Sequence, residues 1–335
     1  MTAARLGAGG LALLFAFTTL YVAAFHAPRA KGLDVGVVGT AVQARDVQSA
    51  LDVRARGAFD VRRFVSVSEA RAALMRTDVH GVVVPGARIL VAGASGLTPT
   101  ETVTDALRAV APVAVVQDVR PLPAGDNRGL ASLFTIVGTL IPSLVFGVLL
   151  SVFGRALPAR VRWGAVTVYA ALAGLVVAFD VDVVVGALTG EFAGVAVVSA
   201  LLALSVSAAA HGLGHLGGPA GIVTALLTLL LLGLSSAGGA VTYELEPGFF
   251  SAVSQFLPPG AALTAVRNVE YFHWAATLAP LLVLGAWAVG GLAFGLLGEL
   301  YGPHVRRADF AASRPNNPSA FPDAIARRSA SSKPA

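Results

Sequence analysis

The stretch ASLFTIVGTLIPSLVFGVLLSVF, residues 131–153, contains no charged side chain. A helix needs about 20 mainly apolar residues to cross the hydrocarbon core of a bilayer. This stretch therefore predicts a transmembrane helix. Outside it, similar stretches predict five further transmembrane helices, at Leu6–Phe25, Trp163–Val185, Phe192–Ala210, Ala220–Ala240 and Thr277–Gly298.

The composition of the 335-residue chain agrees with a membrane protein. Hydrophobic residues make up 56% of the chain and charged residues 13%, whereas a soluble domain carries about 25% charged residues. The absence of cysteine excludes disulfides, thiolate nucleophiles and cysteine metal sites. No basic run is interleaved with aromatic residues, so nucleic acid is not expected as a partner. The expected partner is the lipid bilayer, and no cofactor or metal is predicted.

The first apolar stretch has two interpretations. Signal peptides also begin with a basic residue and an apolar run, but their apolar run is shorter. No clean small-residue cleavage site occurs around Ala23 and Phe25. We therefore expect residues 1–26 to be a retained first transmembrane helix, with a cleaved signal peptide as the alternative.

Basic residues in short loops and tails predict the orientation, because they favour the cytoplasmic side. One side of the membrane would carry ten such residues, and the short loops on the other side carry only Arg267. The ten are Arg5, Arg155, Arg160, Arg162, Arg306, Arg307, Arg314, Arg327, Arg328 and Lys333. Both termini are therefore expected in the cytoplasm, including a disordered basic tail at 301–335. Only two lysines accompany the many arginines, which suggests a bacterial plasma (inner) membrane protein.

Residues 27–130 form a long segment between the first and second predicted transmembrane helices. Strand-like and helix-like periods alternate along it in the order βαβαββαβ, which is typical of a small α/β domain. Ser68 is expected to cap the second helix, and Thr98 with Glu101 is expected to form a capping box on the third. The turn Gly93–Gly96 could hold an anion at a helix N-terminus, although an ordinary strand-to-helix turn explains it more simply.

Residues 247–272 predict a hairpin in the five-helix region 131–300. Two apolar runs too short to span a bilayer flank Pro258, Pro259 and Gly260, which should interrupt any helix. This pattern suggests a re-entrant gate, with a pair of interfacial helices as the alternative. Arg267 and Glu270 are three residues apart and could form an ion pair on one helix face.

Several polar residues lie at or near the predicted membrane. Asp180 and Asp182 end a predicted helix, and with Glu244 and Glu246 they are candidates for an external vestibule. The alternative is a helix end that simply meets water. His211 and His215 have a spacing that can bind zinc, but the glutamate of a metalloprotease is missing, so we expect only a short cytoplasmic loop there.

Two further sequence patterns bear on assembly and energy supply. Gly190–Gly194 and Gly291–Gly295 have the GxxxG spacing that supports close helix packing, either within the chain or in a homodimer. No P-loop motif occurs, and neither lysine could belong to one. Any transport would therefore depend on a separate ATPase or on an ion gradient.

Two stretches carry a resemblance to a known family. Residues 121–129, PLPAGDNRG, run directly into the helix at 131, and residues 256–263, FLPPGAAL, are followed by Arg267-Asn268 and Tyr271-Phe272. Together with the layout of one helix, an external domain and five helices, they resemble YhgE/Pip-like membrane proteins of the ABC-type-2 permease superfamily. The family often has Asp-Pro where this chain has Asp126-Asn127. Many permeases of the superfamily also begin with an amphipathic cytoplasmic helix, for which this chain has no room before Leu6.

The resemblance implies a permease-like subunit of an exporter that relies on a separate ATPase and forms a homodimer. It implies that Arg155, Arg160 and Arg162 lie in the loop that contacts the ATPase, and that residues 247–272 form the external gate. The rival hypothesis is a non-transporting scaffold or secretion accessory protein that binds an envelope partner through its external domain. The sequence contains no catalytic constellation, so the chain is not expected to be an enzyme.

Overall fold

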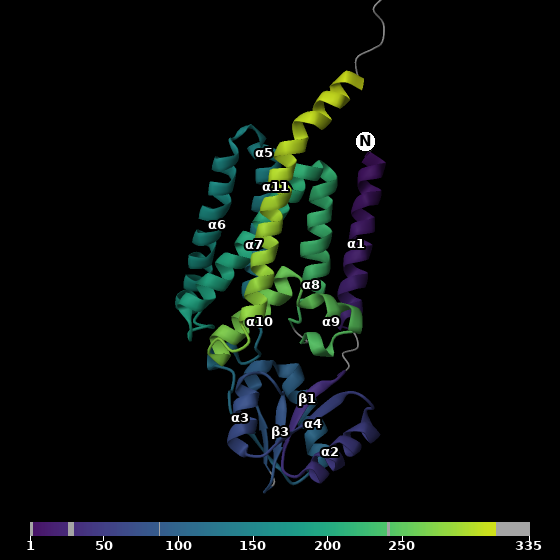
Figure 1. Ribbon diagram of the computed structural model, residues 1–335, viewed down its shortest axis with the longest axis vertical. Helices are drawn as coiled ribbons and strands as arrows, with labels where there is room; N and C mark the ends of the chain where they lie inside the picture. The colour runs from purple at the N-terminus through teal and green to yellow at the C-terminus, as the bar shows by residue number, and fades with distance from the viewer. Residues whose placement is uncertain (1–2, 26–29, 87, 240–241, 313–335) are drawn as a thin grey trace, which may run out of the picture.

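The computed structural model describes residues 3–25, 30–86, 88–239 and 242–312 (Figure 1). A helix bundle forms one end of the molecule and a sheet covered by helices forms the other. The strands and helices of residues 33–118 follow one another in the order expected from the sequence. The elements of the sheet region are β1 (Leu33–Val38), α2 (Ala41–Arg54), β2 (Phe59–Phe64), α3 (Val67–Met75), β3 (Gly81–Val84), β4 (Arg88–Val91), α4 (Leu97–Val110) and β5 (Val115–Asp118).

The five strands form one mixed sheet in the order β2-β1-β3-β4-β5. β1 pairs in parallel with both β2 and β3, with Leu33 opposite Phe59 and Gly36 opposite Val82. β3 and β4 are antiparallel, and the turn between them contains Gly86 with φ at 87°. β4 and β5 are parallel again, so β2 and β5 are the two edges of the sheet.

Helix caps in this region differ from those expected. Ser66, rather than Ser68, caps α3, because its hydroxyl accepts a hydrogen bond from the Glu69 amide. The predicted capping box at Thr98 is wrong, because α4 already begins at Leu97 and Gly96 occupies the cap position. A capping box occurs instead at Thr40, whose side chain and backbone both bond with Gln43.

The two faces of the sheet belong to different hydrophobic cores. On the face covered by α2 and α4, the core includes Val35, Leu51, Ile89 and Leu107. On the face covered by α3, Val82 and Leu90 belong to a core that continues into the helix bundle. The sheet therefore shares one of its cores with the bundle.

Among the described residues, five helices are long and apolar enough to cross a membrane, or six if the bent pair Gly248–Ser254 and Pro258–Phe272 counts as one span. The five are α1 (Ala3–Phe25), α5 (Ala131–Phe153), α6 (Ala159–Phe179), α7 (Phe192–Ala225, continued to Ser235) and α11 (Leu278–Ala312). The chain is thus a helical protein of the kind found in membranes, as the sequence predicted. α11 continues to Ala312, so the first part of the expected tail at 301–335 is helical rather than disordered. Residues 313–335 lie outside the described residues.

The run from Phe192 to Ser235 is 44 residues long and covers most of the two helices expected at 192–210 and 220–240. It is broken at Gly218, whose φ of 56° and ψ of −134° are not helical, and Pro219 follows. The backbone of Gly221 touches the carbonyl group of Leu213, although eight residues of straight helix would separate them by about 12 Å. The chain therefore reverses at Gly218, and Figure 1 shows the two arms running in opposite directions.

α7 lies at the centre of the bundle and packs against α5, α6 and α11. Gly147 of α5 touches the backbone of Ser207, and Gly174 of α6 touches that of Ala196. Both predicted GxxxG patterns are also used inside the chain. Gly194 packs on Val269, and Gly291 packs on the backbone of Ala208, so these glycines hold the bundle together and do not face a second copy.

Candidate functional site between the sheet and the bundle

The predicted hairpin at 247–272 consists of two helices, α9 (Gly248–Ser254) and α10 (Pro258–Phe272), which meet at an angle of 71°. Pro258 and Pro259 do not interrupt a helix as expected. They form the first turn of α10, where a proline's fixed φ and missing N–H are tolerated. The break lies just before them, and Gly260 packs tightly against the carbonyl group of Ser254. Most of α10 is buried, and Figure 1 shows it between the bundle and the sheet.

Two polar side chains fasten α10 to the bundle. Glu270 is 5% exposed and accepts hydrogen bonds from the amides of Gly190 (2.7 Å) and Glu191 (3.2 Å), just before α7. The Tyr271 hydroxyl donates to Oδ2 of Asp126 at 3.2 Å. α10 is therefore tied to the beginnings of two long helices, because Asp126 lies just before α5.

Arg267 and Glu270 do not form the ion pair expected from their spacing. Arg267 donates instead to the carbonyl oxygens of Gly238 (3.4 Å) and Gly239 (2.9 Å). Both lie in the connection that follows the second arm of the Phe192–Ser235 run. Backbone carbonyl groups past a helix end need donors. Each of the two charged side chains thus meets backbone partners in a different connection, and neither remains free for the other.

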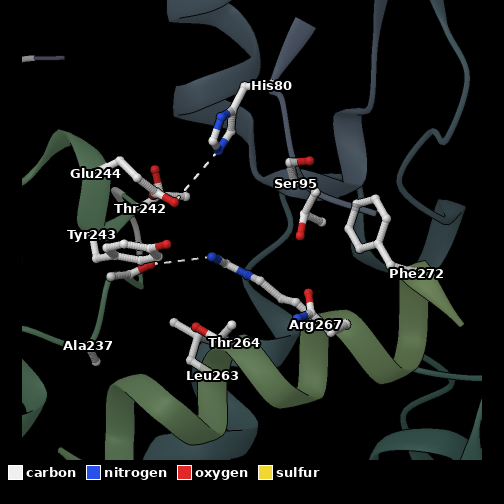
Figure 2. Close-up of a pocket in the computed structure, with 13 residues that line it drawn as sticks. His80, Ser95, Ala237, Thr242, Tyr243, Glu244, Leu263, Thr264, Arg267 and Phe272 are labelled. Carbon is white, nitrogen blue, oxygen red and sulfur yellow. Dashed lines mark hydrogen bonds and ion pairs between the residues drawn. The ribbon is translucent and has the colours of Figure 1, made fainter. Parts of the chain in front are cut away.

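A cavity of about 90 Å³ lies between α10, the connection around Tyr243 and the sheet. Figure 2 shows Arg267 reaching into it from α10, with His80 and Glu244 facing each other on another side. Ser95 reaches the cavity from the turn before α4. The lining residues are Thr77, His80, Ser95, Ala237, Gly238, Thr242, Tyr243, Glu244, Leu263, Thr264, Arg267, Asn268 and Phe272.

Charges around the cavity are only partly compensated. His80 Nε2 and Glu244 Oε1 are 3.7 Å apart. Burial alone would raise the pKa of Glu244, but its interactions with His80 outweigh burial and hold that pKa below the ordinary value. Beside the cavity, Glu246 is 1% exposed and accepts one hydrogen bond, from the Gly238 amide at 3.2 Å. Burial raises the pKa of Glu246 to about 8.

Three polar atoms on the cavity wall have no hydrogen-bond partner among the residues that the structure describes. They are His80 Nδ1, Thr242 Oγ1 and Glu244 Oε2. Buried polar groups are normally satisfied by protein or by water. At about 30 Å³ for each water molecule, the volume suits about three waters or one small polar solute. Within the described residues, no group of three or more histidine or carboxylate side chains could hold a metal ion.

The four carboxylates of the predicted vestibule do not line one cavity. Glu244 faces the cavity described above, and Glu246 lies beside it. Asp180 is exposed and lines a separate groove between α5 and α6. Asp180 and Asp182 both belong to a π-helical turn, Asp180–Val184, that ends α6.

The three arginines predicted to contact an ATPase also differ from one another. Arg155 and Arg160 are exposed near the turn between α5 and α6. Arg162 is buried and forms an ion pair of 2.6 Å with Glu299 of α11, which fixes α6 to α11. Its position is explained by helix packing, so only Arg155 and Arg160 remain available to a partner.

His211 and His215 lie inside α7 and not in the short loop expected there. The helix continues through Gly212 and Gly214 to the break at Gly218. His211 is fully buried and stacks on His215, with ring centroids 5.7 Å apart and Trp163 at its edge. The pair therefore belongs to the aromatic packing between α6 and α7.

The sequence pattern did not predict His80, Thr242 or the pairing of Asp126 with Tyr271. Asp126 and Tyr271 both lie in the two stretches that carry the family resemblance, which was the available signal. Nothing in the local sequence marked His80, because its role depends on a connection that lies far along the chain. In comparisons with known proteins, no protein-family model, curated protein or solved structure matched this chain.

Proposed function

We propose that the chain is the permease-like, membrane-spanning subunit of an ABC-type exporter and that a separate ATPase supplies its energy. The observation that supports this most directly is the placement of α10. It is buried between bundle and sheet and is bonded to the connections that start α5 and α7. A shift of either helix would move α10, and with it the cavity under the sheet. In this proposal α9 and α10 form the outer gate.

The proposed arrangement has six crossings of a bacterial plasma membrane. Each arm of the Phe192–Ser235 run crosses once, because 44 residues of straight helix would extend about 66 Å, about twice the ~30 Å hydrocarbon core. Both termini are then cytoplasmic, and residues 27–130 are outside. The proposal draws support from the position of the start of α1 and of the turn after α5, which both lie at the end of the molecule opposite the sheet (Figure 1).

The orientation can be tested because the chain has no native cysteine. Ser68→Cys and Arg160→Cys each introduce one thiol at an exposed position, on opposite ends of the molecule. In intact cells a membrane-impermeant maleimide should label only the first variant, and both should react after permeabilisation. Labelling of Arg160→Cys in intact cells would overturn the orientation.

The energy source is tested by recovering the full chain in mild detergent and identifying bound proteins by mass spectrometry. A P-loop ATPase in stoichiometric amount is expected. Reversing the charge of Arg155 and Arg160 together should reduce its recovery, whereas Arg71→Glu, an exposed arginine on α3, should leave recovery unchanged. Repeated recovery without any ATPase would contradict the proposal.

In this proposal two copies of the chain form the exporter. Because the GxxxG glycines are used within the chain, the contact would come from another surface. α1 is the best candidate, since Leu11 and Phe15 are 68% and 73% exposed and only 6% of its spanning segment is buried. A single cysteine introduced at Phe15 should therefore cross-link two copies in the membrane.

One observation favours the rival function, a scaffold that binds an envelope protein. β5 is an edge strand, and Val113 and Val115 are 83% and 68% exposed. Exposed strand edges can pair with a strand of another protein. Val115→Lys in the full chain should then abolish recovery of an envelope partner and leave transport unaffected. The proposed exporter predicts instead that recovery of its partner depends on Arg155 and Arg160 and not on Val115.

A further inference from the structure

A long apolar groove runs between α5 and α6 on the outside of the bundle. It consists of two hollows of about 420 and 330 Å³, which share Gly138, Val176 and Val177. Ligand pockets in proteins typically measure about 300–1,000 Å³. The first hollow begins at Ala131, where α5 starts, and the second ends at Pro142.

The groove exists because α5 and α6 both pack closely on α7 and only loosely on each other. Close approach to α7 occurs at Gly147 of α5 and Gly174 of α6, whose backbones touch it. Gly138 lies in the gap itself, and an added Cβ there would meet nothing within 4 Å. The gap is therefore open at a position where the chain provides no side chain to fill it.

The hydroxyl groups that α5 contributes to the groove wall need nothing from a ligand. Thr135 donates to the carbonyl oxygen of Ala131, and Thr139 donates to that of Thr135, both at 2.8 Å. Ser143 donates to the carbonyl oxygen of Thr139. Thr135 and Thr139 line the groove, and their hydroxyl groups are already bonded within the helix. A hydrocarbon is the occupant that such walls match.

The depth of the groove matches one leaflet. Eleven residues separate Ala131 from Pro142, which corresponds to about 17 Å of helix, and half of the ~30 Å hydrocarbon core is about 15 Å. At its inner end the rings of Phe146 and Tyr169 stack with centroids 4.1 Å apart and bridge the two helices. Its outer end is lined by the exposed Asp180.

We propose that a phospholipid from the leaflet on the side of the sheet inserts one acyl chain into this groove. The stacked Phe146 and Tyr169 would stop the chain near mid-membrane, and its headgroup would lie beside Asp180. The inference rests on the proposed function for its membrane orientation, and it names lipid as the class of molecule that the proposed exporter takes.

The test compares lipid retained by three forms of the full chain, reconstituted in vesicles of phosphatidylethanolamine and phosphatidylglycerol and then purified in detergent. Native mass spectrometry counts bound phospholipids on each form. Gly138→Leu places a side chain in the groove, at a position where an added Cβ would meet no protein atom within 4 Å. Gly285→Leu is the matched control. Gly285 is also seven residues into its helix, and α11 begins at the end of the bundle that faces the sheet (Figure 1). A Cβ added at Gly285 also meets nothing within 4 Å.

The wild type and Gly285→Leu should each retain one phospholipid per chain, and Gly138→Leu should retain about tenfold less, a change that corresponds to one order of magnitude in Kd. Equal retention by all three forms would overturn the proposal, and so would a wild type that retains none. Loss of ATPase recovery with lipid retention unchanged would instead contradict only the proposed exporter, so the two failures are distinguishable.

Discussion

The hydroxyl group of Tyr271 and the carboxylate of Asp126 are joined by a 3.2 Å hydrogen bond, although 145 residues separate them in the chain. Asp126 also accepts from the amides of Leu130 (2.9 Å) and Ala131 (3.1 Å) at the start of α5. One carboxylate thus caps a membrane helix and holds α10. The two stretches that resemble the permease family meet at this bond.

Removing either partner should have unequal effects. Tyr271→Phe deletes one hydrogen bond and should cost about 1 kcal/mol of unfolding free energy. Asp126→Ala also removes the cap of α5 and should cost about 2 kcal/mol or more. Thermal unfolding of both single variants and the double variant in detergent gives the coupling between the residues. Strictly additive effects would show that the bond contributes no stability.

Glu246 should make stability depend on pH. Its pKa is about 8 in the folded chain and 4.5 as an ordinary value, so the folded state keeps a proton that the unfolded chain releases in this window. The unfolding free energy should therefore fall as pH rises from about 4.5 to 8, by at most about 1.4 kcal/mol per pH unit, and then level off.

Glu246→Gln should remove that fall and be more stable than the wild type at pH 9. Glu101→Gln, at an exposed position on α4, serves as the control and should leave the pH profile unchanged. Thermal unfolding of the full chain in detergent between pH 5 and 9 provides the measurement. A wild-type profile that stays flat across this range would contradict the assignment.

The ion pair between Arg162 and Glu299 should be structurally important. Glu299→Gln leaves Arg162 buried without its carboxylate. Because Glu299 is 28% exposed, we expect a loss of about 2 kcal/mol, below the 3–5 kcal/mol typical of a fully buried pair. Arg160→Ala, an exposed neighbour, should change stability by less than about 0.5 kcal/mol. Similar effects of the two substitutions would argue against the buried pair.

Two glycines of α5 should respond oppositely to alanine. A Cβ at Gly147 would meet the backbone of Ser207, so Gly147→Ala should push α5 from α7 and cost about 1–3 kcal/mol. At Gly138 there is open space, so Gly138→Ala should be neutral or stabilise the helix by up to about 1 kcal/mol. Chemical denaturation of each variant tests the contrast.

The long apolar stretches and the alternation of strand and helix patterns predicted most of the architecture. Both signals are local, since each depends on the spacing of apolar residues within one element. Helix starts were predicted less well. Ser68 and Thr98 looked like caps in the sequence, but the neighbouring strands fix where the chain turns, and they place Ser66 and Gly96 there.

The candidate site was harder to predict because tertiary contacts decide it. The spacing of Arg267 and Glu270 suggested a pair, but the sequence could not show that two separate connections would bring backbone groups to each of them. His80 and Glu244 come together only because the sheet packs against the connection between Ser235 and α9, which contains Glu244. Gly212 and Gly214 suggested a loop around His211, whereas close packing against α11 keeps that segment helical.

Leu245 lies in the connection before α9, yet it is 2% exposed and belongs to the core between the sheet, α2 and α4. Ribosomes synthesise the strands and helices of that core long before they reach Leu245. By then α5, α6 and α7 have already been made. The sheet therefore acquires its last core residue only after most of the bundle has been synthesised, which makes completion of the sheet region a late step in the biogenesis of the chain.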